Sequence, residues 1–202
     1  MTPKKDYFEH KAQRYEEEVK RVDNVQNIAD AILQNISYSK TMELMDFGSG
    51  TGLLTSKVAP FVKKITAVDM SKAMNEVLSA KLKSFPCELD IIELDLANNE
   101  INQKFHGIVS SMTIHHVEDI LALFKKFYAM LVEGGTIALA DLDKEDGSFH
   151  QEDTGVFHFG FDRDEFLQTA KEAGFKNLNI QLVSVVSKPY GDYPIFLLTG
   201  EK

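Results

Sequence analysis

Apolar and polar residues alternate along the chain in blocks of two kinds. A helical pattern over 117–131 carries an apolar stripe and ends before Gly134 and Gly135, which are typical of a helix C-terminus. Similar helical patterns separate short apolar runs typical of buried strands, at residues 42–47, 65–69, 89–94, 106–112 and 135–141. This alternation predicts βαβ units with right-handed crossovers. The expected fold is α/β, with a doubly wound and mostly parallel sheet.

The N-terminal region precedes this alternation and has two helical patterns of its own. Residues 24–36 place apolar side chains on one face of a helix. Residues 6–20 mix aromatic and charged side chains at a spacing that predicts one or two short amphipathic helices.

The C-terminal region predicts a different pairing. A polar stretch at 143–160 precedes a predicted helix at 162–173 and two apolar runs, 178–186 and 194–199. The connection between these runs, SKPYGDYP, is too short for a crossover helix. The last two strands are therefore expected to pair antiparallel as a hairpin.

Composition narrows the class of protein. A chain of 202 residues is long enough for one well-buried domain and too short for two ordinary domains with a linker. Its 31 acidic side chains outnumber 22 Lys and Arg, so the net charge is −9 and nucleic acid is not an expected partner. A single cysteine fits a reducing compartment, and no apolar leader or membrane-length run occurs. These features predict a cytoplasmic protein without a membrane span.

A glycine-rich run, LMDFGSGTGLL, joins the first predicted strand to a helical pattern. Gly48, Gly50 and Gly52 would leave bare backbone and a helix N-terminus facing a ligand. Their G-x-G-x-G spacing differs from the G-x-G-x-x-G of dinucleotide sites, and the lysine of a P-loop is missing. Asp46, just before the first glycine, would repel a pyrophosphate and suits a cationic amino group.

A second acidic residue, Asp69, ends the next predicted strand in ITAVDMS. A carboxylate at this edge of the sheet is placed to accept hydrogen bonds from vicinal ribose hydroxyls. Ribose without a neighbouring pyrophosphate indicates an adenosine joined to another group. The alternative is that Asp69 only caps a helix that starts at Ser71.

With these residues the sequence resembles the class I S-adenosylmethionine-dependent methyltransferases of small-molecule type, and is similar to ubiquinone/menaquinone C-methyltransferase-like proteins. LMDFGSGTG is similar to the first motif of that family, AVDMS to its second, and LDLAN to its acidic loop at the adenine. FHGIVSSMTIHHV resembles the fourth strand with its loop, and LVEGGTIALAD the turn into the fifth. These pieces follow the family's order and span roughly residues 6–200.

The resemblance implies a Rossmann-like seven-stranded sheet in the order 3-2-1-4-5-7-6 with strand 7 antiparallel. This order agrees with the predicted terminal hairpin. It also implies one methyltransferase domain over residues 1–202. An N-terminal helical cap would occupy 1–40, a cofactor-binding core 41–141, and a substrate-side loop, helix and hairpin 142–202.

The resemblance further implies that S-adenosyl-L-methionine is the cofactor. Three of the implied contacts have a plainer alternative: Tyr15 as a helix-face aromatic, Met70 as core, and Asp95 in a solvated turn. The implied contacts are Tyr15 over the carboxylate, Asp46 at the amino group, Gly48, Ser49, Gly50 and Gly52 around the methionine portion, Asp69 on the ribose hydroxyls, Met70, Asp95 and Leu96 at the adenine, and Ser111 and Met112 on the methionine side.

Histidines are the candidates for a general base beside the methyl acceptor. His115 and His116 end the fourth predicted strand, where neighbouring side chains face opposite ways, so at most one is expected to point into the site. His150 and His158 lie in the polar stretch that would cover the pocket, at a spacing that does not favour a metal. Asp141, which ends the fifth predicted strand, would either face the acceptor or cap the next turn.

The sequence therefore predicts a methyltransferase that acts by in-line displacement on a small-molecule acceptor that the sequence does not identify, as a monomer or a homodimer. A non-catalytic S-adenosylmethionine-binding or regulatory protein of the same fold is the alternative, because no acceptor-specific motif is visible. The glycine spacing disfavours a third possibility, an NAD-dependent oxidoreductase.

Overall fold

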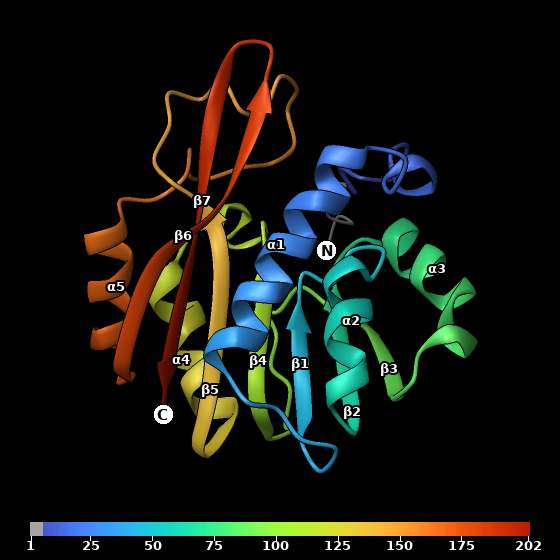
Figure 1. The fold of residues 1–202 in the computed structure, drawn as a ribbon, viewed down its shortest axis with the longest axis vertical. Coiled ribbons are helices and arrows are strands. Elements are labelled where there is room, and N and C mark those ends of the chain that lie inside the picture. The colour runs from blue at the N-terminus through green and yellow to red at the C-terminus, as the bar shows by residue number, and fades with distance from the viewer. Residues whose placement is uncertain (1–5) are drawn as a thin grey trace.

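The computed structural model describes residues 6–202, and the first five residues of the predicted cap lie outside this range. Within it, seven strands form one sheet in the order β3-β2-β1-β4-β5-β7-β6 (Figure 1). β7 is antiparallel to both neighbours, and the other pairs are parallel. The predicted sheet is confirmed. Its strands are β1 Glu43–Phe47, β2 Lys64–Asp69, β3 Glu88–Glu93, β4 Phe105–Ser111, β5 Leu131–Leu142, β6 Lys176–Lys188 and β7 Gly191–Glu201.

Helices cover both faces of the sheet. α1 and α2 pack on one face and α4 and α5 on the other, as the strands' alternating side chains require. Leu44 faces the α1 layer and its neighbour Met45 the α4 layer, both fully buried. The helices are α1 Val19–Asn35, α2 Leu53–Val58, α3 Lys72–Ala80, α4 Ile120–Met130 and α5 Arg163–Glu172, with short 3-10 helices η1 Ala12–Arg14, η2 Ala59–Phe61, η3 Leu82–Ser84 and η4 Ile114–His116.

The α4 layer shows how the apolar stripe predicted for this helix is used. Phe124 and Phe127 have no exposed surface, and burying each contributes roughly 1.5–3 kcal/mol. The helix begins at Ile120 rather than at the predicted residue 117, because the Asp119 side chain accepts a hydrogen bond from the Ala122 amide at 2.9 Å and caps it there.

The N-terminal segment, residues 6–18, is not the amphipathic helix that its spacing predicts. It consists of turns and η1, and α1 then begins at Val19. Its side chains bind distant parts of the chain: Asp6 accepts from the Ser71 hydroxyl at 2.9 Å, and Glu16 pairs with Lys81. Short helices have little stability of their own, so these tertiary contacts determine the local conformation.

The terminal hairpin is longer than its sequence predicts. β6 continues to Lys188, which pairs with Gly191, so only residues 189–190 form the turn. Most of the predicted connection is therefore strand, as expected for a two-residue hairpin loop. The hairpin extends beyond the end of β5, and its tip lies beside the loop that precedes α5 (Figure 1).

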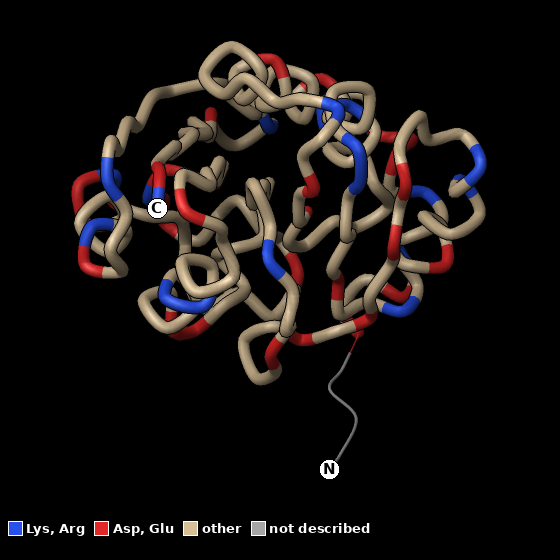
Figure 2. Tube along the Cα trace, turned by 90° about the horizontal axis from the view of Figure 1, so that it is seen from below, with Lys and Arg blue, Asp and Glu red and all other residues tan. Residues whose placement is uncertain are grey.

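The surface is of mixed charge. Figure 2 shows Lys and Arg residues interspersed with Asp and Glu residues around the molecule. In the part of the chain that the structure describes, no helix combines the length and the apolar composition that crossing a bilayer requires.

Candidate functional site

A cavity of about 1050 Å³ lies at the carboxyl end of the parallel strands. The loops after β1, β2, β3 and β4 form one part of its wall, where the strand order reverses between β1 and β4. The N-terminal segment, residues 149–157 and the tip of the β6–β7 hairpin line the rest. The volume is at the upper end of the range of about 300–1,000 Å³ for small-molecule sites, so it can hold a cofactor and a second molecule.

The glycine loop, residues 48–52, uses its glycines for two purposes. All three glycines have positive φ. A Cβ on Gly48 would lie 2.1 Å from the Thr113 side chain, and one on Gly52 would lie 2.4 Å from Leu78. A Cβ on Gly50 would meet no atom within 4 Å, so the backbone there borders the cavity. Gly48 and Gly52 serve packing, whereas Gly50 leaves room for a ligand.

Asp69 connects the glycine loop to the end of β2. Its carboxylate accepts hydrogen bonds from the backbone amides of Gly50 and Ser71, each at 2.8 Å. Burial raises the pKa of Asp69, and the two amide hydrogen bonds oppose that rise. The cap of α3 is Ser71, whose hydroxyl accepts from Met74 N at 3.2 Å. Asp69 as the helix cap is therefore wrong, and its carboxylate borders the cavity.

Asp46 lies beneath the glycine loop and is 1% exposed. Its carboxylate accepts a hydrogen bond from the Thr55 hydroxyl on α2 at 2.5 Å. Burial raises the pKa of Asp46 to about 7. The residue borders the cavity, and its predicted contact with an amino group stays a prediction.

The loop after β3 contains Asp95 and Leu96. Asp95 accepts hydrogen bonds from the Ala97 amide at 3.2 Å and the Asn98 side chain at 2.8 Å, so it organises this turn. Leu96 is buried, and both residues line the cavity.

Lys126 on α4 holds the same loop from below, and the sequence did not point to it. Its ammonium donates to the carbonyl oxygens of Leu96, Ala97 and Asn99 at 2.9, 2.8 and 3.0 Å. Nothing in the pattern FKKFY separates Lys126 from its exposed neighbour Lys125. The contact depends on the packing of α4 against the end of β3.

The end of β4 has an unusual backbone. Met112 has a φ of +57°, a left-handed conformation that costs a residue with a side chain roughly 1–2 kcal/mol. Its amide donates to the Ala140 carbonyl oxygen at 2.9 Å, and this bond holds the turn against β5. Ser111 and Met112 both line the cavity, and their place beside the methionine portion of the cofactor stays a prediction.

The structure does not place Met70 in the core or Tyr15 on the face of an α-helix, which were the alternatives to a cofactor contact. Met70 is 39% exposed beside Asp69 and is not a core residue. Tyr15 follows η1, lines the cavity, and lies under the Arg21 guanidinium, whose carbon is 4.0 Å from the ring centre. Burial raises the pKa of Tyr15.

Several buried polar atoms on the cavity wall have no hydrogen-bond partner in the protein. A buried polar group without a partner is costly, so such atoms indicate where a polar ligand binds. Among the described residues they are Asn24 Oδ1, Ser49 Oγ, Thr51 Oγ1, Ser111 Oγ, His115 Nε2 and His150 Nε2.

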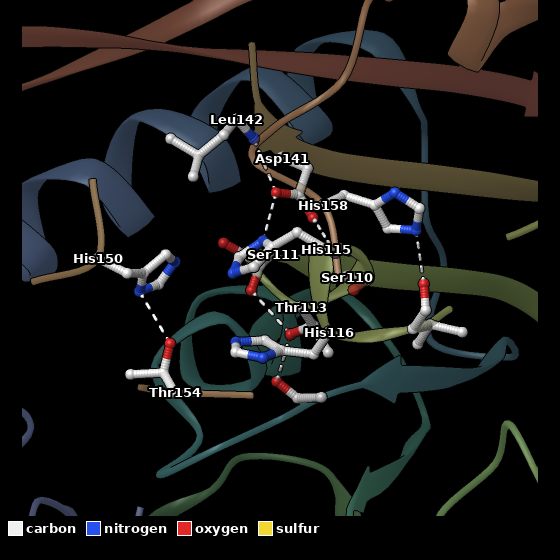
Figure 3. Close-up of polar contacts among 12 residues, drawn as sticks. Ser110, Ser111, Thr113, His115, His116, Asp141, Leu142, His150, Thr154 and His158 are labelled. Atoms are coloured by element: carbon white, nitrogen blue, oxygen red, sulfur yellow. Dashed lines mark hydrogen bonds and ion pairs between the residues drawn. The ribbon is translucent and has the colours of Figure 1, made fainter. Parts of the chain in front are cut away.

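His115 and Asp141 form a buried pair at the far side of the cavity (Figure 3). His115 Nδ1 lies 2.6 Å from Asp141 Oδ1, and the backbone amides of His115 and Leu142 donate to the same carboxylate at 3.2 and 2.8 Å. Burial would raise the pKa of Asp141, but His115 and these amides hold it below its ordinary value. Asp141 thus binds His115 rather than only capping a turn.

His116 and His150 adjoin this pair. Ring centres lie 4.4 Å apart for His115 and His116, and 5.2 Å apart for His115 and His150. His115 and His116 belong to η4 and not to β4, and both line the cavity, so the expectation that at most one faces it is wrong. Burial and neighbouring imidazoles lower the pKa of His116 to about 4 and of His150 to about 3.

His158 does not belong to the cavity, contrary to the prediction. Its Nε2 lies 3.0 Å from the Val117 carbonyl oxygen and 3.2 Å from that of Glu118, and Figure 3 shows its ring directed away from His115. Its role is to hold the polar loop against the end of η4. Among residues 6–202, no three His, Cys, Asp or Glu side chains gather in a way that suits a metal ion.

The polar stretch 143–160, here called the roof loop, covers the cavity together with the N-terminal segment. The amide of Phe157 donates to the His115 carbonyl oxygen at 2.9 Å, which holds the loop over η4. Lys11 pairs with Glu152 at 2.6 Å and joins the two covering segments. On the opposite wall, Lys188 donates to the Phe149 carbonyl oxygen at 2.5 Å and lies over that ring.

Comparison with known sequences places the chain in a family. The sequence model of the family described as "Methyltransferase domain" matches residues 11–180. The chain belongs to this family. An uncharacterized methyltransferase of Schizosaccharomyces pombe is 30% identical over 156 residues, which are 69% of this chain and 55% of the relative. The chain therefore spans little more than half the length of that relative.

Solved structures share the fold. DhpI, solved as a complex with SAH, is 17% identical with a TM-score of 0.76, over 97% of this chain and 93% of that one. Phosphoethanolamine N-methyltransferase 2 of Haemonchus contortus, solved in complex with S-adenosyl-L-methionine, is 14% identical with a TM-score of 0.74, over 98% of this chain and 59% of that one. At these identities the likeness concerns the fold.

Proposed function

We propose that the protein is an S-adenosylmethionine-dependent methyltransferase that acts on a small-molecule acceptor. Membership of the methyltransferase domain family supports this activity. The observation that carries the proposal is one continuous cavity, with Gly50 and Asp69 on one side and a roofed second half beside His115. A cavity of this kind can bring a cofactor and an acceptor together.

The residues on the cofactor side fit this ligand. The Asp69 carboxylate has lone pairs left after its two amide bonds, and these can accept from ribose hydroxyls. Ser49 and Ser111 offer hydroxyls without protein partners to the polar methionine portion. Gly50 lets this portion approach the backbone. Once bound, the cofactor supplies a methyl group that its sulfonium already activates.

The chain itself would orient the two ligands and exclude water. The roof loop and the N-terminal segment close over the cavity through Lys11 and Glu152, and the contact of Gly155 with Tyr7 is tight enough that a Cβ there would lie 2.6 Å from the ring. Holding two reactants in line within a closed site is a large part of catalysis for a methyl donor of this kind.

The remaining parts of the hypothesis rest on the sequence. A single domain over 1–202 with a cap, core and substrate side, a cytoplasmic location, a monomeric or dimeric state and the lack of a nucleic-acid partner stay predictions. The chain has 31 acidic residues and 22 Lys and Arg, and this excess of negative charge supports a small-molecule substrate over nucleic acid.

Calorimetric titration with S-adenosylhomocysteine and with NAD tests the cofactor. We expect binding of the first and none of the second, and an affinity for S-adenosylhomocysteine at least tenfold lower in Asp69→Ala. Asp90→Ala is the matched control, because this exposed aspartate lies on β3 and pairs only with Lys64 among the ion pairs of the described residues. Binding of NAD instead would contradict the proposal.

Transfer of a labelled methyl group from S-adenosylmethionine into a panel of small acceptors tests the activity. We expect at least one acceptor to be labelled by the wild type and by Asp90→Ala, and much less by Asp69→Ala. Cofactor binding without transfer to any acceptor would instead favour a non-catalytic binding or regulatory protein.

A further inference from the structure

His115 has the hydrogen-bonding arrangement of a poised base. Its Nδ1 lies 2.6 Å from the Asp141 carboxylate, which accepts hydrogen bonds and so favours the tautomer with the proton on Nδ1. The lone pair of that tautomer lies on Nε2, which is buried and has no protein partner, and His115 is among the residues that line the cavity.

Asp141 is held in place as firmly as the imidazole. Backbone amides of His115 and Leu142 donate to its two oxygens at 3.2 and 2.8 Å, and the residue is fully buried at the end of β5. A carboxylate fixed in this way orients the ring and stabilises an imidazolium if Nε2 takes a proton.

The other three histidines near the roof loop lack such a carboxylate. His116 Nδ1 lies 3.4 Å from the Gly155 carbonyl oxygen, and His150 Nδ1 lies 3.2 Å from the Thr154 hydroxyl. Burial lowers the pKa of both rings, so they are weak bases. His158 faces away from the cavity.

Charged groups of both signs lie near His115. Asp141 approaches from β5, neutral His116 from η4 and neutral His150 from the roof loop. Lys188 of β6 lines the same cavity, forms no salt bridge among the described residues, and contributes to the lowered pKa of His150. The unprotonated nitrogen of His115 suits an acceptor that must lose a proton as it is methylated, and a hydroxyl group is such an acceptor.

We propose that His115 is the catalytic base, that Asp141 is its positioning residue, and that the acceptor is a small molecule with a hydroxyl group. The proposal rests on the methyltransferase activity proposed above and names the chemical class of its acceptor.

The methyl transfer balances in protons and electrons with the acceptor, the cofactor, His115 and Asp141. The acceptor oxygen donates a lone pair to the methyl carbon, the carbon–sulfur bond breaks, and its electron pair stays on sulfur, which gives S-adenosylhomocysteine and a methyl ether. The hydroxyl proton passes to His115 Nε2. Asp141 stabilises the resulting imidazolium, which then loses the proton to water.

Nitrogen-15 NMR of the imidazoles in the ligand-free protein tests the arrangement without any turnover. We expect His115 to carry its proton on Nδ1 and a free lone pair on Nε2, and Asp141→Asn to change this distribution. The spectrum of His115→Gln assigns the signal, and His106→Gln, at the opposite end of β4, is the control. A proton on Nε2 in the wild type would overturn the proposal.

The second test uses an acceptor labelled by the wild type. For a hydroxyl acceptor we expect His115→Gln to lower kcat at least about 100-fold, with the affinity for S-adenosylhomocysteine unchanged within threefold. The pH profile of the rate should differ between the wild type and His115→Gln. His106→Gln should keep both the wild-type rate and its pH profile.

Two results would refute the proposal while leaving the methyltransferase intact. One is a His115→Gln enzyme with the wild-type rate and pH profile. The other is transfer confined to amines, thiols or carbon acids. Failure of S-adenosylhomocysteine to bind the wild type would instead remove the proposed function itself. Because Asp141→Asn removes a buried charge partner, its thermal unfolding is measured beside that of His115→Gln, which leaves Asp141 in place.

Discussion

The two halves of the cavity are built in different ways. The cofactor half uses backbone and carboxylates from consecutive strand ends, such as the glycine loop and Asp69, which are joined by a 2.8 Å bond from Gly50. The half proposed for the acceptor is lined by side chains from η4, the roof loop and the terminal hairpin, which are far apart in sequence, and Asp141 of β5 binds His115 from outside the cavity. A parallel sheet always brings the carboxyl ends of its strands to one edge, so the loops that follow these strands meet there. The proposed acceptor half depends instead on how the longest loops pack.

The largest expected effect is the loss of stability in Gly48→Ala, which tests whether Gly48 serves packing rather than ligand binding. Gly48→Ala should lower the free energy of unfolding by on the order of 3 kcal/mol, because the new Cβ would lie 2.1 Å from Thr113 and the φ of +69° is unfavourable for alanine. Denaturant unfolding measures this loss. A stable Gly48→Ala protein would show that Thr113 can move away.

Gly50→Ala should affect ligand binding more than stability, the reverse of Gly48→Ala. Its Cβ meets no atom within 4 Å, so the fold should lose only about 1 kcal/mol from the left-handed backbone. The affinity for S-adenosylhomocysteine, measured by calorimetry, should fall at least tenfold because the methyl group occupies the cavity. Unchanged affinity would indicate that the ligand does not approach this residue.

The acceptor half should weaken the fold in acid. The pKa of His116 is about 4 in the folded protein and about 6.5 in an unfolded chain, so the unfolded state binds more protons between these values. Stability should therefore fall by about 1–3 kcal/mol as the pH drops from 6.5 to 4. Denaturant midpoints across this window should fall less steeply in His116→Gln than in the wild type or in His106→Gln. If the denaturant midpoint changed equally with pH in all three proteins, the loss of stability in acid would come from a group other than His116.

The smallest effect tests a cofactor-side contact that comes from tertiary packing. Lys126→Met removes three bonds to the loop of Asp95 and Leu96, and should weaken S-adenosylhomocysteine binding by about fivefold, or about 1 kcal/mol. Lys125→Met is the matched control, since this neighbour is exposed. Equal losses in the two variants would show that the contact does not shape the site.

Much of the fold could be predicted because its periodicities are local. Each strand of the sheet was expected within a few residues of its position, apart from the longer reach of β5, β6 and β7. The predictions failed where contacts across the molecule overrode local spacing. Residues 6–18 form turns because Asp6 and Glu16 bind α3 and the segment after it, and the hairpin connection became strand because its residues pair across the turn.

In the candidate site too, residues in local sequence motifs could be predicted, whereas residues placed by contacts across the molecule could not. The predicted cofactor-side residues line the cavity with the exception of Gly52, and their contacts with a cofactor stay predictions. Among the four histidines, three line the cavity and His158 does not, and the sequence offered no way to separate them. Lys126 was missed because a lysine that binds carbonyl oxygens looks like any other surface lysine.

The sequence by itself determined the succession of strands and helices and the glycine loop, because strand and helix periods and positive-φ glycines are properties of short segments. The order of the strands in the sheet was implied by the family resemblance. Only the tertiary structure decided that Asp141 binds His115 and that His115 lines the cavity with a buried Nε2 that has no protein partner. The choice of base depends on a hydrogen bond between residues 26 positions apart. A distance of 2.6 Å between two such atoms exists only after the sheet has brought the ends of β4 and β5 side by side.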